Sequence, residues 1–174
     1  MEYTEKDLVK IAKRENNTKR NYLVVDPLQG KHIPVVPSKA LDLFAALADT
    51  SGRNTKMKNF LLVGFAETAT AIGAQAAITV GADYIQTTRE VIPGVNYLFF
   101  SEEHSHATEQ KLVKDDIDRA AAETDRIIFI EDEVTTGKTI RNIISILDRE
   151  YDGKFKYSVA SRVKRNERGE SGTL

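Results

Sequence analysis

The stretch from Ile127 to Thr139 places four apolar residues, three acids and a Thr-Thr-Gly turn in direct succession. The apolar residues 127–130 predict a strand covered on both faces, and the isoleucines that follow the turn predict a helix. In open parallel sheets, ligands bind at the carboxyl ends of the strands. Exposed amides and the dipole at a helix start favour a phosphate by about 0.3 to 2 kcal/mol. We therefore expect a phosphate here, with hydroxyl donors from Thr135, Thr136 and Thr139 and close backbone approach at Gly137.

The acids Glu131 and Asp132 need a separate explanation, because a carboxylate repels a phosphate. They make sense if they accept hydrogen bonds from sugar hydroxyls close to that phosphate. Such charged hydrogen bonds are worth about 1.5 to 3 kcal/mol each. The stretch therefore predicts a ligand with a phosphate at one end and a diol beside it, and ribose 5-phosphate fits.

Two other interpretations of this stretch compete with the sugar-phosphate site. The run Gly137-Lys138-Thr139 is like the end of a nucleotide-binding P-loop, but that motif needs a glycine five residues before Gly137, where this chain has Asp132. The second alternative is an ordinary strand-to-helix turn with solvated acids. Three acids followed by Thr-Thr-Gly form a more specific pattern than such a turn requires.

The rest of the chain alternates strand-like and helix-like segments. We predict strands at 22–25, 60–63, 84–88, 97–100, 127–130 and 155–160, and an extended segment at 32–36. We predict helices at 4–13, 115–123 and 140–147, a helix that begins at residue 38, and a helix that includes residues 72–77. This alternation predicts an α/β fold with a central, mainly parallel sheet flanked by helices.

The composition excludes several kinds of protein. With 25 basic and 26 acidic residues the net charge is -1, so we do not expect a nucleic-acid partner. The absence of cysteine excludes disulfides, thiolate catalysis and cysteine-ligated zinc. The charged N-terminus is unlike a secretory signal, and no apolar run reaches the roughly 18 residues of a membrane span. We expect a cytoplasmic protein that does not bind membranes.

The stretch 127–139 resembles the ribose-phosphate signature of the type I phosphoribosyltransferase family. It departs from that signature at Glu133, where an apolar or small residue is usual, and at Lys138, where a small residue is usual. The resemblance implies the type I phosphoribosyltransferase fold, with a small hood over the sheet edge. It also implies that Glu131 and Asp132 are catalytic residues that hold the ribose hydroxyls, and that residues 135–139, Lys138 included, hold the 5-phosphate.

A second turn, residues 64–73, follows the strand at 60–63 and precedes a helix. Its backbone amides suit a second anion. In the family the corresponding turn binds pyrophosphate. By this resemblance, Ala66, Glu67 and Thr68 would form the centre of the turn. Arg89, at the end of the next strand, is suited to neutralise departing pyrophosphate as a catalytic residue. A plain turn and a solvated surface arginine stay open as alternatives.

The polar segment 101–108 lies where the family closes a loop over the reacting centre. In that interpretation His104 and His106 contact pyrophosphate or transfer a proton. If the segment is extended, both histidines and Glu102 share a side, which leaves metal binding as an alternative.

The N-terminal residues correspond to the hood, which surrounds the acceptor in the family. We expect a helix and hood segment at 1–37, a core at 38–161 and a flexible tail at 162–174. In the hood, the candidates to contact and recognise the acceptor are Gln29, Lys31 and His32. The alternative is that this segment is a simple turn. Residues 24–32, 64–69 and 101–106 are similar to an orotate phosphoribosyltransferase-like branch from bacterial tellurium-resistance and stress gene clusters.

The resemblance implies a phosphoribosyltransferase, a pentosyltransferase that uses 5-phosphoribosyl 1-pyrophosphate (PRPP). Mg²⁺ is its expected cofactor, held through PRPP and also by Glu131 and Asp132. The expected partners are PRPP or a ribonucleotide, a nucleobase-like acceptor, and a second copy of the chain in a homodimer. The alternative is a regulator or scaffold in a stress-response system that binds PRPP or a nucleotide without turnover, because binding needs only the phosphate and diol sites.

Overall fold

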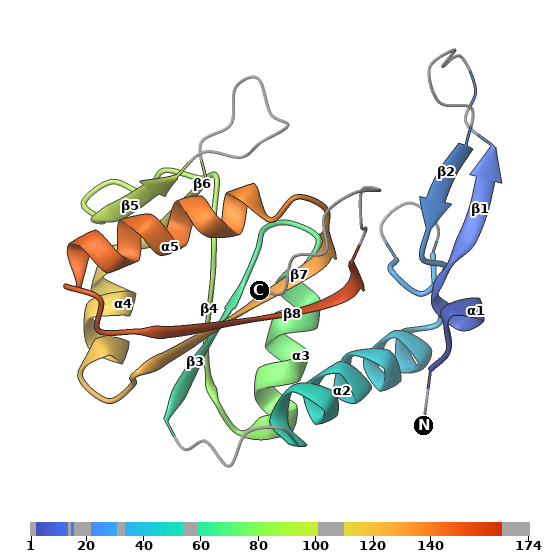
Figure 1. Cartoon of the computed structure of the whole chain (residues 1–174), viewed down its shortest axis with the longest axis horizontal. Helices are drawn as coiled ribbons and strands as arrows, with labels where there is room; N and C mark the ends of the chain where they lie inside the picture. Colours follow the sequence, from blue (N-terminus) through green and yellow to red (C-terminus); the bar gives the residue numbers. More distant parts are fainter. Residues whose placement is uncertain are drawn as a thin grey trace.

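A computed structural model of the chain describes residues 3–13, 15, 22–30, 34–53, 59–100 and 110–164. A parallel sheet of four strands in the order β4-β3-β7-β8 forms its centre (Figure 1). These strands are β3 (Phe60–Gly64), β4 (Asp83–Gln86), β7 (Arg126–Val134) and β8 (Lys156–Lys164). The apolar strands β3 and β7 occupy the middle, as sequences buried on both faces require. The predicted α/β fold is confirmed.

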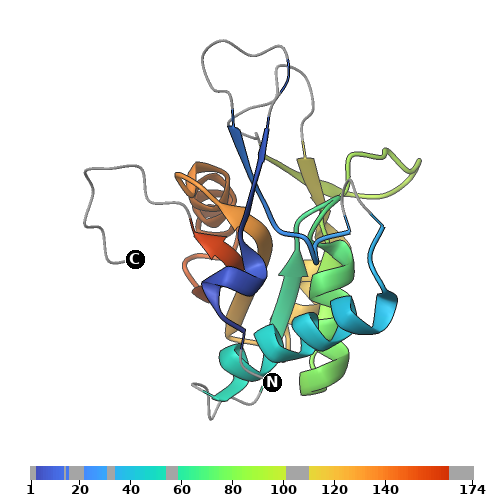
Figure 2. The same cartoon turned by 90° about the vertical axis from the view of Figure 1, so that its right-hand side faces the viewer.

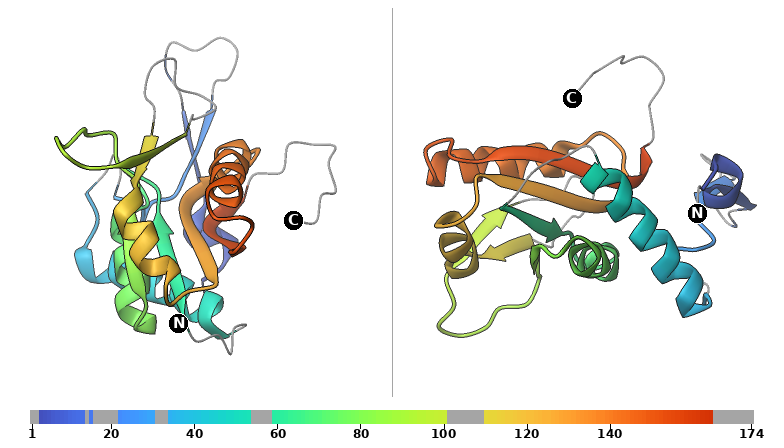
Figure 3. Two further views of the ribbon diagram at one scale, coloured as in Figure 1. Left: turned by 90° about the vertical axis from the view of Figure 1, so that its left-hand side faces the viewer. Right: turned by 90° about the horizontal axis from the view of Figure 1, so that it is seen from below.

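Helices cover both faces of this sheet, with α3 and α5 on opposite sides (Figure 3). On one side lie α2 (Pro37–Arg53) and α3 (Thr70–Val80), and on the other lie α4 (Lys114–Ala121) and α5 (Lys138–Glu150). Helix α5 turns Ile140, Ile143 and Leu147 toward the sheet, because residues three and four apart share one face of a helix. None of the helices in the described ranges has the length and apolar character needed to span a membrane.

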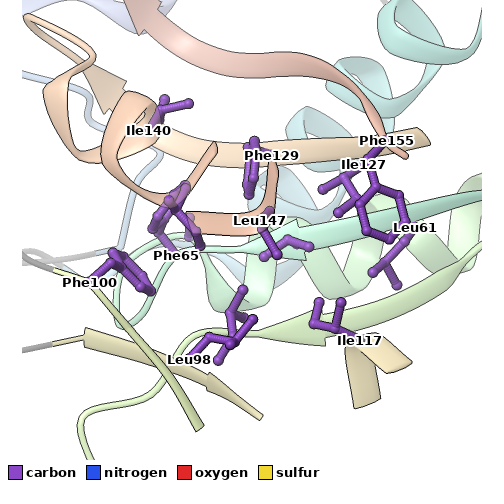
Figure 4. Packing of buried hydrophobic residues seen from close by; sticks show 14 of the residues in the cluster. Leu61, Phe65, Leu98, Phe100, Ile117, Ile127, Phe129, Ile140, Leu147 and Phe155 are labelled. Carbon is purple, nitrogen blue, oxygen red and sulfur yellow. The ribbon is translucent and has the colours of Figure 1, made fainter. Parts of the chain in front are cut away.

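Strand β7 divides its side chains between two hydrophobic cores. Ile127 and Phe129 pack on the α4–α5 side, whereas Ile128 and Ile130 pack on the α2–α3 side, as strand alternation requires. In the first core the ring of Phe65 lies 6.1 Å from Phe100 and 5.7 Å from Phe129 between centroids (Figure 4). Aromatic packing of Phe65 against the core thus fixes the turn that follows β3.

Two antiparallel hairpins flank the sheet. The β1 (Lys10–Lys13) and β2 (Tyr22–Val25) hairpin follows α1 (Glu5–Leu8) and projects away from the sheet (Figures 1 and 2). The sequence predicts a single helix over 4–13, and this is wrong beyond Leu8, because residues 10–13 pair with β2. The second hairpin joins β5 (Tyr97–Phe100) to β6 (Gln110–Val113), a strand that the sequence analysis misses.

Three further boundaries differ from those predicted. Strand β4 ends at Gln86, and residues 34–36 form no strand. Strand β7 continues through the three acids to Val134, because β8 pairs with it along its whole length. The flexible tail predicted from Arg162 is wrong at its start: β8 runs to Lys164, and the Arg162 side chain is only 2% exposed. Residues 165–174 lie outside the described ranges.

Candidate active site

A cleft of about 390 Å³ opens at the carboxyl edge of the sheet. Its walls are the turn after β3, the end of β7 and the start of α5, with contributions from Arg89 after β4 and from Gln110, the first residue of β6. The residues that line it are Ala66, Glu67, Thr68, Arg89, Gln110, Glu131, Asp132, Glu133, Val134, Thr135, Thr136, Gly137, Lys138, Thr139 and Ile140. Both turns predicted to bind anions therefore face one cavity.

The turn between β7 and α5 has the local geometry of an anion site. Gly137 is the residue before the helix and has φ of 69°, a left-handed conformation that glycine adopts without steric cost. The Lys138 amide donates to Thr136 Oγ1 at 3.3 Å, and residues 135–139 all line the cleft. Because amides at the first turn of a helix lack partners within the helix, this end of α5 favours a phosphate.

The two predicted ribose-binding acids lie on opposite faces of β7. Asp132 follows Ile128 and Ile130 on the α2–α3 side, and Glu131 follows Phe129 on the α5 side. Asp132 is 8% exposed, and Glu131 is half-buried with its Oε1 accepting the Asp132 amide at 3.0 Å. Both nevertheless line the cleft, because the strand ends there. A sugar in the cleft would meet one acid from each side of the strand.

The N-terminal segment reaches this site through a buried ion pair. Arg162 Nη1 lies 2.5 Å from Asp26 Oδ2, with the two side chains 2% and 4% exposed. Asp26 Oδ1 also accepts the Leu28 amide at 2.7 Å, and Gln29 Nε2 donates to Asp132 Oδ2. Burial lowers the pKa of Arg162, while the carboxylates of Asp26 and Asp132 oppose that shift. The hood segment at 26–29 is thus fixed next to a candidate ribose-binding acid.

The turn after β3 is held by a closed set of hydrogen bonds. The Ala66 amide donates to Thr87 Oγ1 at 2.7 Å, Gln110 Nε2 donates to the Ala66 carbonyl at 2.7 Å, and the Thr87 hydroxyl donates to Gln110 Oε1. Thr87 and Gln110 are 0% and 1% exposed. The peptide bond between Ala66 and Glu67 is cis. Both backbone groups of Ala66 are therefore fixed by buried side chains.

Arg89 lies on the same side of the cleft as this turn. Its Nη1 is 3.6 Å from Glu67 Oε1, with side-chain exposures of 34% and 77%. Lys111 Nζ donates to the Arg89 carbonyl at 2.8 Å, and a two-residue bridge joins Thr88 to Lys111. Arg89 is thus positioned by β6 and reaches the cleft.

The structure brings together in one cleft the predicted phosphate, ribose and pyrophosphate residues that it describes. These are Glu131, Asp132, Arg89, Ala66, Glu67, Thr68 and residues 135–139. Four predicted residues, His104, His106, Lys31 and His32, lie outside the described ranges, as does the segment 101–108. The sequence pattern does not indicate three residues that hold this site together, Asp26, Gln110 and Arg162. In the sequence, Asp26 lies before Pro27 and Arg162 begins a charged stretch, and neither feature indicates burial.

Comparison with known proteins agrees with this geometry. The model of a family described as phosphoribosyl transferase matches residues 8–171, nearly the whole chain and all of the described cleft. The chain belongs to the phosphoribosyl transferase family. It is therefore a member of an enzyme family of pentosyltransferases. No curated protein matches the sequence.

Solved phosphoribosyltransferase structures share the fold at low sequence identity. Adenine phosphoribosyltransferase from Rhodothermus marinus aligns with a TM-score of 0.59 and 13% identity, over 91% of this chain and 83% of that one. The enzyme from Thermoanaerobacter pseudethanolicus aligns with a TM-score of 0.59 and 14% identity, over 92% of this chain and 97% of that one. A third structure is the Trypanosoma brucei enzyme in complex with AMP, pyrophosphate and ribose-5-phosphate. It aligns with a TM-score of 0.60 and 13% identity, over 90% of this chain and 64% of that one. At these identities the similarity concerns the fold.

The charges that line the cleft of this phosphoribosyltransferase family member would suit a cation beside an anionic ligand. Among the described residues that line it are the four acids Glu67, Glu131, Asp132 and Glu133, against two cations, Arg89 and Lys138. A pyrophosphate in such surroundings needs further positive charge. Mg²⁺ binds through one or two carboxylates together with substrate phosphates, and Glu131 and Asp132 are suitable donors. No group of three or more His, Cys, Asp or Glu able to hold a metal occurs in the described part of the chain.

Proposed function

We propose that this protein transfers a phosphoribosyl group between PRPP and a nucleobase-like acceptor. The observation that carries the proposal is the position of the two turns: Ala66–Thr68 and Thr135–Thr139 line one cleft, with Glu131 and Asp132 also on its wall. A ligand that fills this cleft carries two anionic groups with a diol. PRPP has its 5-phosphate and its pyrophosphate at opposite ends of a ribose, so it fits the arrangement.

Each part of the site has a separate task in this reaction. The start of α5 holds the 5-phosphate, and the carboxylates of Glu131 and Asp132 accept hydrogen bonds from the ribose hydroxyls. The bond between ribose C1 and the pyrophosphate oxygen breaks, and C1 forms a bond to an acceptor nitrogen. Arg89 stabilises the charge that collects on the departing pyrophosphate. Glu131 and Asp132, fixed near the ribose, also stabilise the positive charge that develops on the sugar.

Magnesium is the cofactor that we propose for this site, held by Glu131 or Asp132 together with ligand oxygens. When bound, it supplies positive charge that neutralises the pyrophosphate. Residues 26–29 lie beside Asp132, and Gln29 donates a hydrogen bond to that carboxylate. We therefore place the acceptor against this hood segment.

A nucleobase as acceptor is supported by the neighbours in fold. The Trypanosoma brucei enzyme is in complex with AMP, and the Saccharomyces cerevisiae enzyme is in complex with adenine. The sequence segments at 24–32 and 64–69 support an orotate-type acceptor and a role in the stress-associated branch. We also propose a cytoplasmic homodimer.

Pyrophosphate release across a panel of bases tests the proposal. The protein with Mg²⁺ and PRPP should release pyrophosphate with at least one base, adenine and orotate included, and not without a base. The reverse reaction, nucleotide plus pyrophosphate, should form PRPP at the same site. Tight PRPP binding with no release for any base, in either direction, would favour the regulator or scaffold and would overturn transfer.

A further inference from the structure

Thr87 and Gln110 form a closed ring of hydrogen bonds with Ala66, the first residue of the turn that faces the cleft. The ring uses both backbone groups of Ala66: its N–H donates to Thr87 Oγ1 at 2.7 Å and its carbonyl accepts from Gln110 Nε2 at 2.7 Å. The Thr87 hydroxyl closes the ring by donating to Gln110 Oε1. Three elements are tied together in this way, since Thr87 follows β4 and Gln110 begins β6.

Burial makes this ring rigid. Thr87 is 0% exposed and Gln110 is 1% exposed, so water does not compete for their polar atoms. The Thr87 amide also donates to the Gly64 carbonyl at 2.9 Å, which attaches the ring to the end of β3. A buried polar group that loses its partner carries a full desolvation cost, and for this reason such rings hold one conformation.

The ring also determines which groups of the turn remain for a ligand. Because Ala66 has both backbone groups engaged, it anchors the turn and has no donor to offer. Glu67 accepts from Thr70 Oγ1 at 2.9 Å through its carbonyl. In the described part of the chain, the amides of Glu67 and Thr68 donate to no protein group, and both residues line the cleft. These two amides are the donors that a pyrophosphate can meet.

Strand β6 supports Arg89 from the adjacent position. Lys111, 5% exposed, donates from Nζ to the Arg89 carbonyl at 2.8 Å, and its backbone exchanges hydrogen bonds with Thr88 at 2.8 and 3.0 Å. The first two residues of β6 therefore fix both groups on the pyrophosphate side, the turn and the arginine.

We propose that Thr87 and Gln110 are positioning residues that hold the amides of Glu67 and Thr68 in place for the pyrophosphate of PRPP. They act through Ala66 and do not contact the reacting atoms. The inference rests on the proposed function, since it needs the turn at 66–68 to be the pyrophosphate site. It goes beyond that function by assigning the preorganisation of this half of the site to two buried side chains.

Three ligands separate a positioning role from a merely structural one. Titration calorimetry with Mg²⁺ compares PRPP, inorganic pyrophosphate and ribose 5-phosphate on the wild type and on Thr87→Val and Gln110→Leu. Affinity for PRPP and pyrophosphate should fall about tenfold or more, as expected when buried hydrogen bonds are lost. Affinity for ribose 5-phosphate should change less than about twofold, because it uses the start of α5.

Conservative and matched variants complete the test. Thr87→Ser keeps the hydroxyl and should restore PRPP binding, and Gln110→Met, with a similar shape, replaces Gln110→Leu if that variant does not fold. Gln86→Leu, an exposed glutamine next to Thr87, is the control and should bind all three ligands like the wild type. Equal losses for all three ligands, or no loss for any, would overturn the positioning role. A wild type that binds none of them would instead overturn the proposed function.

Discussion

At the scale of single residues, Asp132 is the most buried of the described charged residues that line the cleft. It is 8% exposed, lies at the end of a central strand and accepts a hydrogen bond from Gln29. A buried carboxylate is costly unless it is hydrogen-bonded, so its retention here requires a partner. The hood supplies one such partner, and a ribose hydroxyl would supply another, because an ionised carboxylate accepts about four hydrogen bonds.

Asp132→Asn should weaken the binding of PRPP with Mg²⁺ by about tenfold, or about 1.4 kcal/mol, because a charged hydrogen bond becomes a neutral one. Titration calorimetry measures this change. Asp125→Asn removes an exposed carboxylate at the other end of β7 and should leave binding unchanged. Equal affinities for the wild type and Asp132→Asn would show that this acid does not hold the ribose.

The residues that line the end of β7 and the start of α5 in the cleft could be predicted well from sequence. Glu131, Asp132 and the Thr-Thr-Gly turn are contiguous, so their spacing alone places them at a strand end before a helix. Gln110 and Arg162 could not be predicted in this way. Their importance comes from contacts with Ala66 and Asp26, and residues so far apart in sequence meet only through the completed sheet.

At the scale of elements, a buried ion pair helps to attach the hood segment to the core. Asp26 follows β2, and Arg162 lies on β8, one of the two edge strands of the central sheet. Removing one partner of such a pair leaves an uncompensated buried charge, which is far more costly than losing both. The sequence predicts a loose tail at Arg162 because charged residues follow it. The structure differs because residues 162–164 belong to β8, which pairs with β7, and because Arg162 is buried against Asp26.

Arg162→Met should lower the free energy of unfolding by about 3 to 5 kcal/mol, since Asp26 remains buried without its cation. Urea unfolding gives the value. The double variant Arg162→Met/Asp26→Asn should recover part of this loss, because the uncompensated charge is gone. A single variant within about 0.5 kcal/mol of the wild type would show that the pair does not anchor the segment.

Helix α3 is positioned against β4 by a close contact at Gly73. A Cβ at this position would lie 2.6 Å from Tyr84 Cε2, and Tyr84 donates from its hydroxyl to the Thr70 carbonyl at 2.9 Å. The tyrosine thus packs across the first turn of α3, directly after the turn at 66–68. Glycine leaves the room that this ring needs.

Gly73→Ala should destabilise the protein by about 1 to 3 kcal/mol through overpacking, although alanine favours helices by about 1 kcal/mol. In a Tyr84→Leu background the same substitution should be neutral or stabilising. Urea unfolding of the four proteins in this cycle measures the coupling. Identical effects of Gly73→Ala in both backgrounds would contradict the contact.

At the scale of the whole molecule, three partly buried tyrosines link stability to alkaline pH. Burial raises the pKa of Tyr84 to about 12. Burial, and then a hydrogen bond to Asp118 or Asp148, raises the pKa of Tyr151 and Tyr157. The folded state therefore holds these protons more tightly than the unfolded state, in which tyrosine titrates near pH 10. The contribution of these tyrosines to the free energy of unfolding is fully present below about pH 10 and is lost as the pH rises toward 12.

The free energy of unfolding should fall between about pH 9 and about pH 11, and Tyr84→Phe should reduce that fall, because phenylalanine has no proton to lose. Urea unfolding at the two pH values measures the difference. Tyr22→Phe, at a tyrosine that is 48% exposed, is the matched control. A fall of the same size in Tyr84→Phe and the wild type would contradict the assignment.

The α/β architecture could be predicted because β3, β7 and α5 have strong apolar periodicity. The hairpins could not be predicted, because β1 and β6 are short and contain lysines, and pairing alone makes them strands. The two halves of the cleft were also predictable separately, while the contacts that hold them at a fixed distance come from the assembled sheet.

The central claim is that one cleft binds both ends of a phosphorylated ribose. A crystal structure with PRPP and Mg²⁺ tests it most directly. The 5-phosphate should lie on the backbone of residues 135–139, the ribose hydroxyls should contact Glu131 and Asp132, and the pyrophosphate should contact the amides of Glu67 and Thr68. PRPP bound elsewhere, or both acids turned away from the ribose with the α5 start empty, would contradict the claim.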